Sequence, residues 1–127
     1  MILVDTSVWV DHLRRGDDQL ALLLDDGQVA THPFVIGELA LGHLNPRQSI
    51  LRTLEDLPQA SVATEREVLH LIDRYTLFGT GISYVGAHLV AAARLTAGVS
   101  IWTRDKHLVR IAAKFGLEAS PMSKKNA

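Results

Sequence analysis

Short apolar runs alternate along the chain with longer segments in which apolar residues recur at helical spacing. The short runs have the length of strands, whereas recurrence at every third or fourth residue is typical of amphipathic helices. The predicted strands cover residues 2–4, 29–31 and 99–102, with shorter candidates at 60–63 and 117–119. The predicted helices begin near residues 6, 17, 33, 46, 64, 84 and 105.

Residues that favour helix starts support this assignment. Thr6 or Ser7 is expected to cap the first helix, and Asn45 to cap a helix with Pro46 in its first turn. Residues 64–67, Thr-Glu-Arg-Glu, match the spacing of a capping box. The pattern therefore predicts the helix starts from local chemistry as well as from periodicity.

Strands that alternate with helices predict an α/β fold with a central parallel sheet covered by helices on both faces. In such sheets ligands bind beyond the carboxyl ends of the strands. Asp5 and Asp105 each follow a predicted strand directly. We therefore expect both carboxylates at the edge of the sheet where a site would form.

Composition narrows the class of protein. The 127 residues fit one domain, which we place at residues 1–120, followed by a flexible tail at 121–127. The formal net charge is −1, so a general basic field for nucleic acid is excluded. There is no cysteine, which excludes thiolate metal sites and thiol catalysis. No apolar run reaches membrane-spanning length, so we expect a soluble protein that is not exported.

Three acidic residues are candidates for a shared site. Asp5 and Asp105 end strands, and Glu38 lies among apolar residues on a predicted helix. A cluster of carboxylates needs protons or a cation to offset its repulsion, and hard oxygen ligands favour Mg²⁺ or Mn²⁺. Such an ion could activate water for attack on a phosphodiester. The alternatives are structural: Asp5 and Asp105 cap their own helices, and a basic neighbour neutralises Glu38.

Residues 2–9, 35–39 and 102–105 together resemble the acidic motifs of PIN-domain ribonucleases, and of VapC-type toxins in particular. The resemblance implies a PIN-like three-layer α/β/α domain that acts as a Mg²⁺- or Mn²⁺-dependent endoribonuclease. It implies cleavage of structured RNA such as transfer or ribosomal RNA, inhibition of translation, silencing by a cognate VapB-type antitoxin, a homodimer and a cytoplasmic location. By position, Asp5, Glu38 and Asp105 would be catalytic acids and metal ligands, with Thr103 as a nearby hydroxyl.

One motif departs from the family pattern. Residues 81–89 read Gly-Ile-Ser-Tyr-Val-Gly-Ala-His-Leu, with Gly86 where the family usually has aspartate. With Ser83 as N-cap, Gly86 would be the third residue of its helix, where an acid favours the helix dipole. Gly86 either relieves crowding or marks a degenerate member, or it is a substitution that removes a metal ligand. We expect the correct fold with weak or absent nuclease activity.

Two other functions compete with this hypothesis. A non-catalytic PIN-like module could bind antitoxin or RNA without cleavage. A phosphatase with Asp5 as covalent nucleophile is less favoured, because Ser7 stands where a second aspartate is needed. Among the cations, Arg104 is the best placed by sequence to contact RNA phosphates. Trp102 is expected to pack in the core.

Overall fold

The computed structural model describes residues 1–119, and the predicted tail at 121–127 lies outside the described residues. Three strands form the sheet: β1 (Ile2–Val4), β2 (Val29–Ala30) and β3 (Ser100–Trp102). The helices are α1 (Thr6–Arg15), α2 (Asp18–Asp25), α3 (Pro33–Ala40), α4 (Arg47–Asp56), α5 (Glu65–Arg74), α6 (Tyr84–Leu95) and α7 (Lys106–Lys114).

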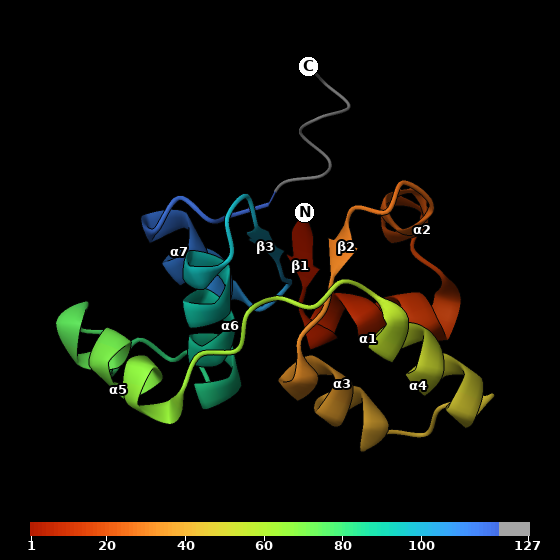
Figure 1. Ribbon diagram of the computed structural model, residues 1–127, viewed down its shortest axis with the longest axis horizontal. Helices are drawn as coiled ribbons and strands as arrows, with labels where there is room; N and C mark the ends of the chain where they lie inside the picture. The colour runs from red at the N-terminus through yellow and green to blue at the C-terminus, as the bar shows by residue number, and fades with distance from the viewer. Residues whose placement is uncertain (120–127) are drawn as a thin grey trace.

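The strand order is β2-β1-β3, and both pairings are parallel. Figure 1 shows the strands side by side at the centre, with α5, α6 and α7 toward the left and α1 to α4 toward the right. The predicted α/β fold with a central parallel sheet is confirmed. Because β1 is central, the chain leaves it toward β2 on one side and later reaches β3 on the other, which makes the end of β1 a topological switch point.

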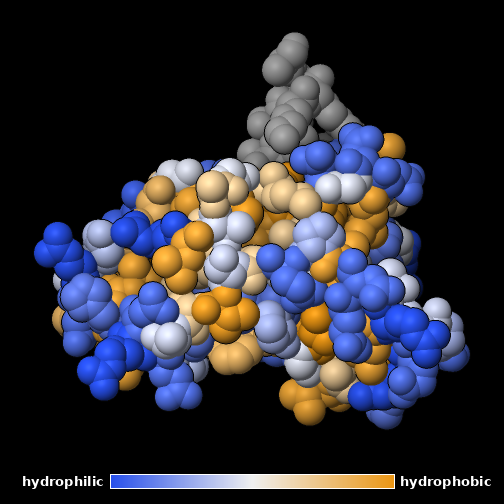
Figure 2. All heavy atoms as spheres, in the orientation of Figure 1, coloured by the Kyte–Doolittle hydropathy of each residue, from blue (hydrophilic) through white to orange (hydrophobic). Residues whose placement is uncertain are grey.

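The core follows from the apolar pattern. All three residues of β1 are buried, and Leu3 and Val4 have no exposed surface. On α6 every residue from Gly86 to Ala93 is buried, and the small alanines allow this helix to pack closely on β3. Figure 2 shows hydrophilic residues over α5 and α4 at the two sides of one face, with hydrophobic residues between them.

Several predicted boundaries are wrong by one or two residues. Asp5, and neither Thr6 nor Ser7, is the N-cap residue of α1, because Asp5 still has extended backbone (φ −73°, ψ 159°). Pro46 is likewise the extended N-cap residue of α4, which begins one residue later. The α6 helix ends at Leu95, because Thr96 is extended and its hydroxyl donates to the Ala92 carbonyl (2.7 Å).

Of the two further strand candidates, 117–119 is reduced to a single bridge, and 60–63 is wrong, because the bridge there is made by Gln59, one residue earlier. Thr31 pairs with Gln59 and Ile101 pairs with Glu118, both in parallel. By contrast, the capping box at residues 64–67 is confirmed, with both of its reciprocal hydrogen bonds present. None of the helices within residues 1–119 combines the length and the apolar character that crossing a membrane requires.

Candidate active site at the carboxyl edge of the sheet

Each of the three strands runs directly into the start of a helix at one edge of the sheet. The N-cap residues there are Asp5 before α1, His32 before α3 and Asp105 before α7. The backbone N–H of Asp5 donates to the Trp102 carbonyl (2.9 Å), so the junctions after β1 and β3 are adjacent. The fold therefore brings the segments around Asp5 and Asp105 together, as the strand-end argument predicts.

The Asp5 carboxylate is buried and accepts hydrogen bonds from two hydroxyl groups. Thr103 donates to its Oδ2 at 2.7 Å, and Ser7 donates to the same oxygen at 3.1 Å. No side-chain bond from Asp5 caps α1. The structural alternative for Asp5, that its carboxylate serves only as a helix cap, is therefore wrong.

Thr103 and Ser7 connect this carboxylate to the segment that carries Asp105. The Thr103 hydroxyl accepts from the backbone N–H of Asp105 (3.1 Å), and the Ser7 hydroxyl accepts from that of Arg104 (3.0 Å). Asp105 itself caps α7, because its Oδ1 accepts from the backbone N–H of His107 (2.9 Å). Asp105 therefore does act as a helix cap, and this cap uses only one of its two carboxylate oxygens.

Glu38 approaches the same region from α3. Its Oε1 accepts from the hydroxyl of Thr6, the residue that follows Asp5, at 2.7 Å. Within residues 1–119 no lysine, arginine or histidine forms an ion pair with Glu38. The alternative of a basic neighbour that neutralises Glu38 finds no support among these residues.

The donor set suits a hard cation, but the carboxylates are not gathered around one point. Asp5, Glu38 and Asp105 each have one oxygen that makes no protein hydrogen bond in the described chain. No three acidic or histidine side chains of residues 1–119 lie close enough to form a metal-binding group. Mg²⁺ commonly takes one or two carboxylates and completes its shell with water and substrate phosphate. The residues present fit that mode of binding.

Two glycines near the start of α6 differ in whether their position requires glycine. Gly81 has φ +92°, and a Cβ there would meet the His107 ring at 2.8 Å, so this position needs glycine. At Gly86 the nearest atom to a Cβ would be Ser83 Oγ at 3.4 Å, followed by Ile82 and Leu108 side-chain atoms at 3.7 Å. A Cβ at Gly86 would make only ordinary van der Waals contacts, so the idea that glycine relieves crowding there is not supported.

Gly86 occupies the predicted position at the start of α6. Ser83 is the N-cap residue, and its hydroxyl accepts from the Gly86 backbone N–H (3.0 Å). The neighbour of the added Cβ, Leu108, lies on α7 three residues after Asp105. An acidic side chain at position 86 would therefore lie near the first turn of α7.

Arg104 forms ion pairs with two carboxylates, and no sequence pattern predicts either pair. Its Nη1 pairs with Asp11 at 2.5 Å, its Nη2 pairs with Asp17, and its guanidinium carbon lies 5.5 Å from the centre of the Trp102 ring. Burial raises the pKa of Asp17, but hydrogen bonds from Arg104 and the backbone N–H of Leu20 outweigh it, so this pKa is lowered. Arg104 thus connects the β3–α7 segment to α1 and α2, and its contact with RNA phosphate stays a prediction.

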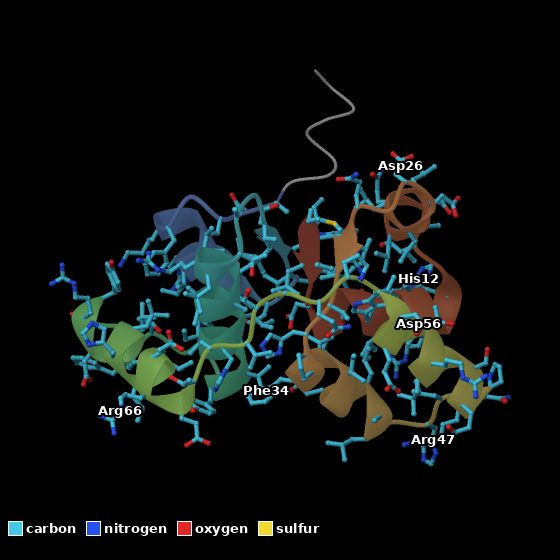
Figure 3. The ribbon with its side chains drawn as sticks, viewed as in Figure 1. His12, Asp26, Phe34, Arg47, Asp56 and Arg66 are labelled. Atoms are coloured by element: carbon cyan, nitrogen blue, oxygen red, sulfur yellow. The ribbon has the colours of Figure 1, made fainter. Side chains whose placement is uncertain are left out.

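A group of histidine and aromatic rings lies beside the third junction. His32 and His88 are buried with ring centres 6.3 Å apart, and Phe34 and Tyr84 lie 4.4 and 4.7 Å from His88. Figure 3 shows Phe34 between α3 and α6. Burial, with the His88 charge as a second cause, lowers the pKa of His32 to about 4, and burial also lowers the pKa of His88. Both rings are therefore neutral near pH 7.

The site residues that sequence reasoning missed are chiefly hydroxyl groups. Thr6 and Ser7, which the sequence predicts as helix caps, instead bind Glu38 and Asp5. Their position could have indicated this role, because both follow a strand-end acid directly and lie on the first turn of the next helix.

The chain is similar to known proteins along most of its length. The family model described as PIN domain matches residues 2–114. Two curated relatives, each named Ribonuclease VapC32, come from Mycobacterium tuberculosis strains CDC 1551 / Oshkosh and ATCC 25618 / H37Rv. Each is 46% identical over 117 residues, which cover 92% of this chain and 94% of the relative.

Proposed function

Since this chain belongs to the PIN-domain family as a VapC-type ribonuclease, we propose that it derives from an RNA phosphodiesterase that uses Mg²⁺ or Mn²⁺. Its substrate would be a structured RNA, such as transfer or ribosomal RNA, whose cleavage inhibits translation. The observation that carries the proposal is the hydrogen-bond network in which Thr103 binds the Asp5 carboxylate and the Asp105 backbone. This network links the Asp5 carboxylate to the backbone of Asp105 at the switch point of the sheet, which supports the proposal.

The residues have distinct proposed roles. The free oxygens of Asp5 and Asp105 would hold the ion, and Glu38 would act on the same ion or on its water from α3. When bound, the ion would activate a water molecule and neutralise charge that develops on the scissile phosphate. Thr103 and Ser7 orient the Asp5 carboxylate by their hydrogen bonds, which keeps its other oxygen directed away from them. Thr103 is therefore a positioning residue in this proposal.

We further propose that Gly86 attenuates this activity. A missing carboxylate lowers both the negative charge and the number of ligands at the site, and both changes weaken divalent-ion affinity. The room for a Cβ at Gly86 supports this view, because neither a clash at the Cβ nor a left-handed backbone explains why an acid is absent. The glycine thus has no structural advantage that would account for it.

A groove beside Glu38 supports the antitoxin part of the proposal. The cavity between α1 and α3 has a volume of about 420 Å³ and an apolar lining that includes Val10, Leu13 and Leu39. Glu38 also lines it, so an occupant would lie against one of the proposed catalytic acids. We propose that a VapB-type antitoxin segment binds here, that the protein is a homodimer, and that it acts in the cytoplasm.

A charge in the groove tests the antitoxin site. Leu13→Glu should weaken antitoxin binding in a calorimetric titration.

Restoring the carboxylate tests the nuclease proposal. We expect Gly86→Asp to cleave a labelled structured RNA at least about 100-fold faster than the unchanged chain in Mg²⁺ or Mn²⁺, and to lose that activity in EDTA. Gly86→Asn is the matched control, because it has nearly the same volume without the charge. We expect it to remain as slow as the unchanged chain.

Other outcomes have definite meanings. Equal cleavage by the glycine, asparagine and aspartate forms would show that position 86 is not a ligand. If none of the three cleaves any RNA tested although all are folded by circular dichroism, the chain is a non-catalytic module, and the nuclease proposal is overturned.

A further inference from the structure

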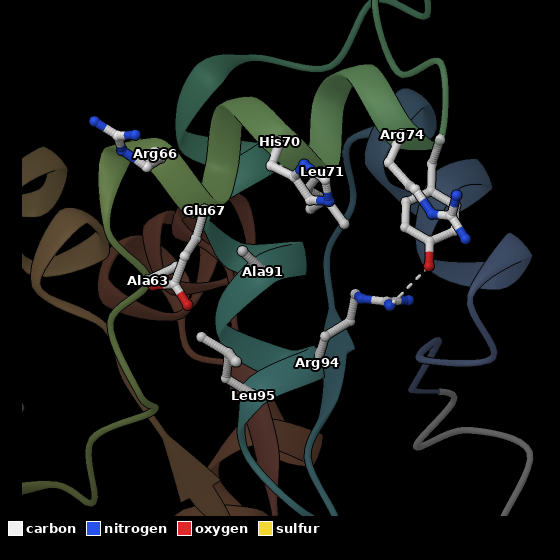
Figure 4. Close-up of a pocket in the computed structure, with 10 residues that line it drawn as sticks. Ala63, Arg66, Glu67, His70, Leu71, Arg74, Ala91, Arg94 and Leu95 are labelled. Carbon is white, nitrogen blue, oxygen red and sulfur yellow. Dashed lines mark hydrogen bonds between the residues drawn. The ribbon is translucent and has the colours of Figure 1, made fainter.

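A second groove lies between α5 and the last turn of α6, at the opposite end of α6 from Ser83 and Gly86. Its volume is about 460 Å³. Small and aliphatic side chains form its floor: Ala63, Leu71, Ala91 and Leu95. Figure 4 shows Arg66 at one end of the groove and Arg74 with Arg94 at the other. The groove therefore combines an apolar floor with basic ends.

The charges that line this groove are not balanced. Arg66, Arg74 and Arg94 form no ion pair with any acid in the described part of the chain. The one acid in the lining, Glu67, accepts a hydrogen bond from the Thr64 backbone N–H (2.8 Å) as part of the capping box. The groove is thus locally positive in a chain whose formal net charge is −1.

The aromatic ring in the lining, Tyr75, already contacts other side chains of this chain. Arg94 donates to the Tyr75 hydroxyl (3.0 Å) and its guanidinium carbon lies 4.8 Å from the centre of the Tyr75 ring. Arg74 lies 5.9 Å from the same ring, and Phe115 packs edge-on against it at 4.9 Å. Stacking of RNA bases needs an open aromatic face. The Tyr75 ring already contacts Arg94, Arg74 and Phe115, so the lining favours aliphatic side chains over stacked nucleotides.

We propose that this groove binds an acidic amphipathic helix of a partner protein, with aliphatic side chains on the floor and carboxylates against the arginines. Helix-in-groove recognition uses apolar residues at positions i, i+3 or i+4, and i+7 of the bound helix. Arg66 and Arg74 are eight residues apart on α5, which corresponds to roughly 12 Å along the helix axis. Partner carboxylates about two turns apart would match that spacing.

The exposed surface at the groove is consistent with a site that is covered in a complex. Leu95 is 51% exposed and Tyr75 is 40% exposed, and both line the groove. The aliphatic contacts would stabilise the complex, whereas the arginines would select an acidic sequence and speed association.

Binding of designed peptides to the full chain tests this proposal. The probe is a fluorescein-labelled helical peptide of about 14 residues, with leucines at i, i+4 and i+7 and glutamates on either side of them. Two matched probes replace every glutamate with glutamine or with lysine. We expect the glutamate peptide to bind in a fluorescence-anisotropy titration at least tenfold more tightly than either matched probe, and binding to weaken as salt rises.

Protein variants locate the binding. The double variant Arg66→Glu/Arg74→Glu should weaken binding of the glutamate peptide at least tenfold. Arg52→Glu/Arg110→Glu makes the same charge change on α4 and α7, where both residues are exposed, and should change affinity less than twofold. Leu95→Glu should also weaken binding, because it places a charge on the apolar floor. Circular dichroism and melting curves confirm that each variant is folded.

Several results would overturn the proposal. These are no binding of the glutamate peptide at millimolar protein, equal binding of the glutamine peptide, or equal loss in the Arg52/Arg110 control. Tighter binding of a single-stranded RNA of about 12 nucleotides in EDTA, lost in the Arg66/Arg74 variant, would assign the groove to RNA instead. None of these results depends on cleavage activity, so they are independent of the nuclease proposal.

Discussion

The junctions after β1 and β3 have the same layout but use their aspartates differently. Asp5 and Asp105 each follow a buried strand, and each is the N-cap residue of the next helix. Asp105 binds the end of its helix through Oδ1, whereas Asp5 binds the hydroxyls of Ser7 and Thr103 and leaves its helix uncapped. An acid at a strand end is thus not structural or functional by position alone. Its hydrogen-bond partners decide how it is used.

The third junction, between β2 and α3, has a histidine in place of the aspartate. His32 occupies the N-cap position of α3, and its Nδ1 accepts from the Phe34 backbone N–H (3.0 Å). The ring is buried and neutral, so this junction places no negative charge at the edge of the sheet. The acid on this side is provided instead by Glu38, which lies further along α3.

The largest expected effect concerns the activity of the two aspartates. In the Gly86→Asp background we expect Asp5→Asn and Asp105→Asn each to reduce RNA cleavage by about 100-fold or more, because both remove a charged oxygen ligand. The measurement is single-turnover cleavage of a labelled RNA in Mg²⁺. Asp18→Asn, at the start of α2, is a matched control that should retain activity. Full activity of Asp105→Asn would mean that Asp105 is only a helix cap.

The next effect concerns pH and the His32 junction. The folded pKa of His32 is about 4, below the ordinary value of 6.5, so the unfolded chain binds the proton more readily. The free energy of unfolding should therefore fall as pH drops from 6.5 toward 4, by up to about 1.4 kcal/mol per pH unit for this group. Above pH 6.5 the contribution is fully present. Urea unfolding between about pH 4.5 and about pH 7.5 measures this slope.

A variant identifies the group responsible for the pH dependence. His32→Asn keeps a side-chain acceptor at the N-cap position but does not titrate. We expect the slope to decrease in this variant without vanishing, because burial lowers the pKa of His88 in the same direction. An unchanged slope would exclude His32 as a main source.

The smallest effect concerns helix capping at the β3 junction. Asp105→Ala should reduce the free energy of unfolding by about 1 kcal/mol, because the His107 backbone N–H loses its acceptor. Asp105→Asn should stay within about 0.5 kcal/mol of the unchanged chain, because asparagine is an equally good N-cap residue. Chemical denaturation compares the two. Equal stability of the alanine and asparagine variants would show that the cap contributes little.

The fold was largely predictable because its signals are local. Strand-length apolar runs, helical periodicity and the capping box at residues 64–67 indicate the central sheet and the helices. The errors arose where partners distant in sequence decide the structure. The candidate at 117–119 keeps a single bridge at Glu118, whereas 60–63 forms none, because the neighbouring chain pairs with Gln59 instead.

The site was predictable in position but not in its connections. Because Asp5 and Asp105 follow apolar strand-length runs, the sequence pattern predicts them at one edge of the sheet, whereas Thr103 was expected only from the resemblance to the family. The pairing of Arg104 with Asp11 and Asp17 joins residues more than 80 positions apart, and no local pattern encodes it. For the same reason the polar face of α5 gave no sign in the sequence that its arginines border an apolar groove.

The shared hydroxyl of Thr103 has a consequence for motion. Because this single group donates to the Asp5 carboxylate and accepts from the Asp105 backbone, we expect a displacement of the Asp5 carboxylate to move the backbone that carries Asp105. The two acids should therefore fluctuate in concert rather than independently, and their separation should vary less than that of either from Glu38. Valine at position 103, which preserves the shape but neither hydrogen bond, would uncouple them.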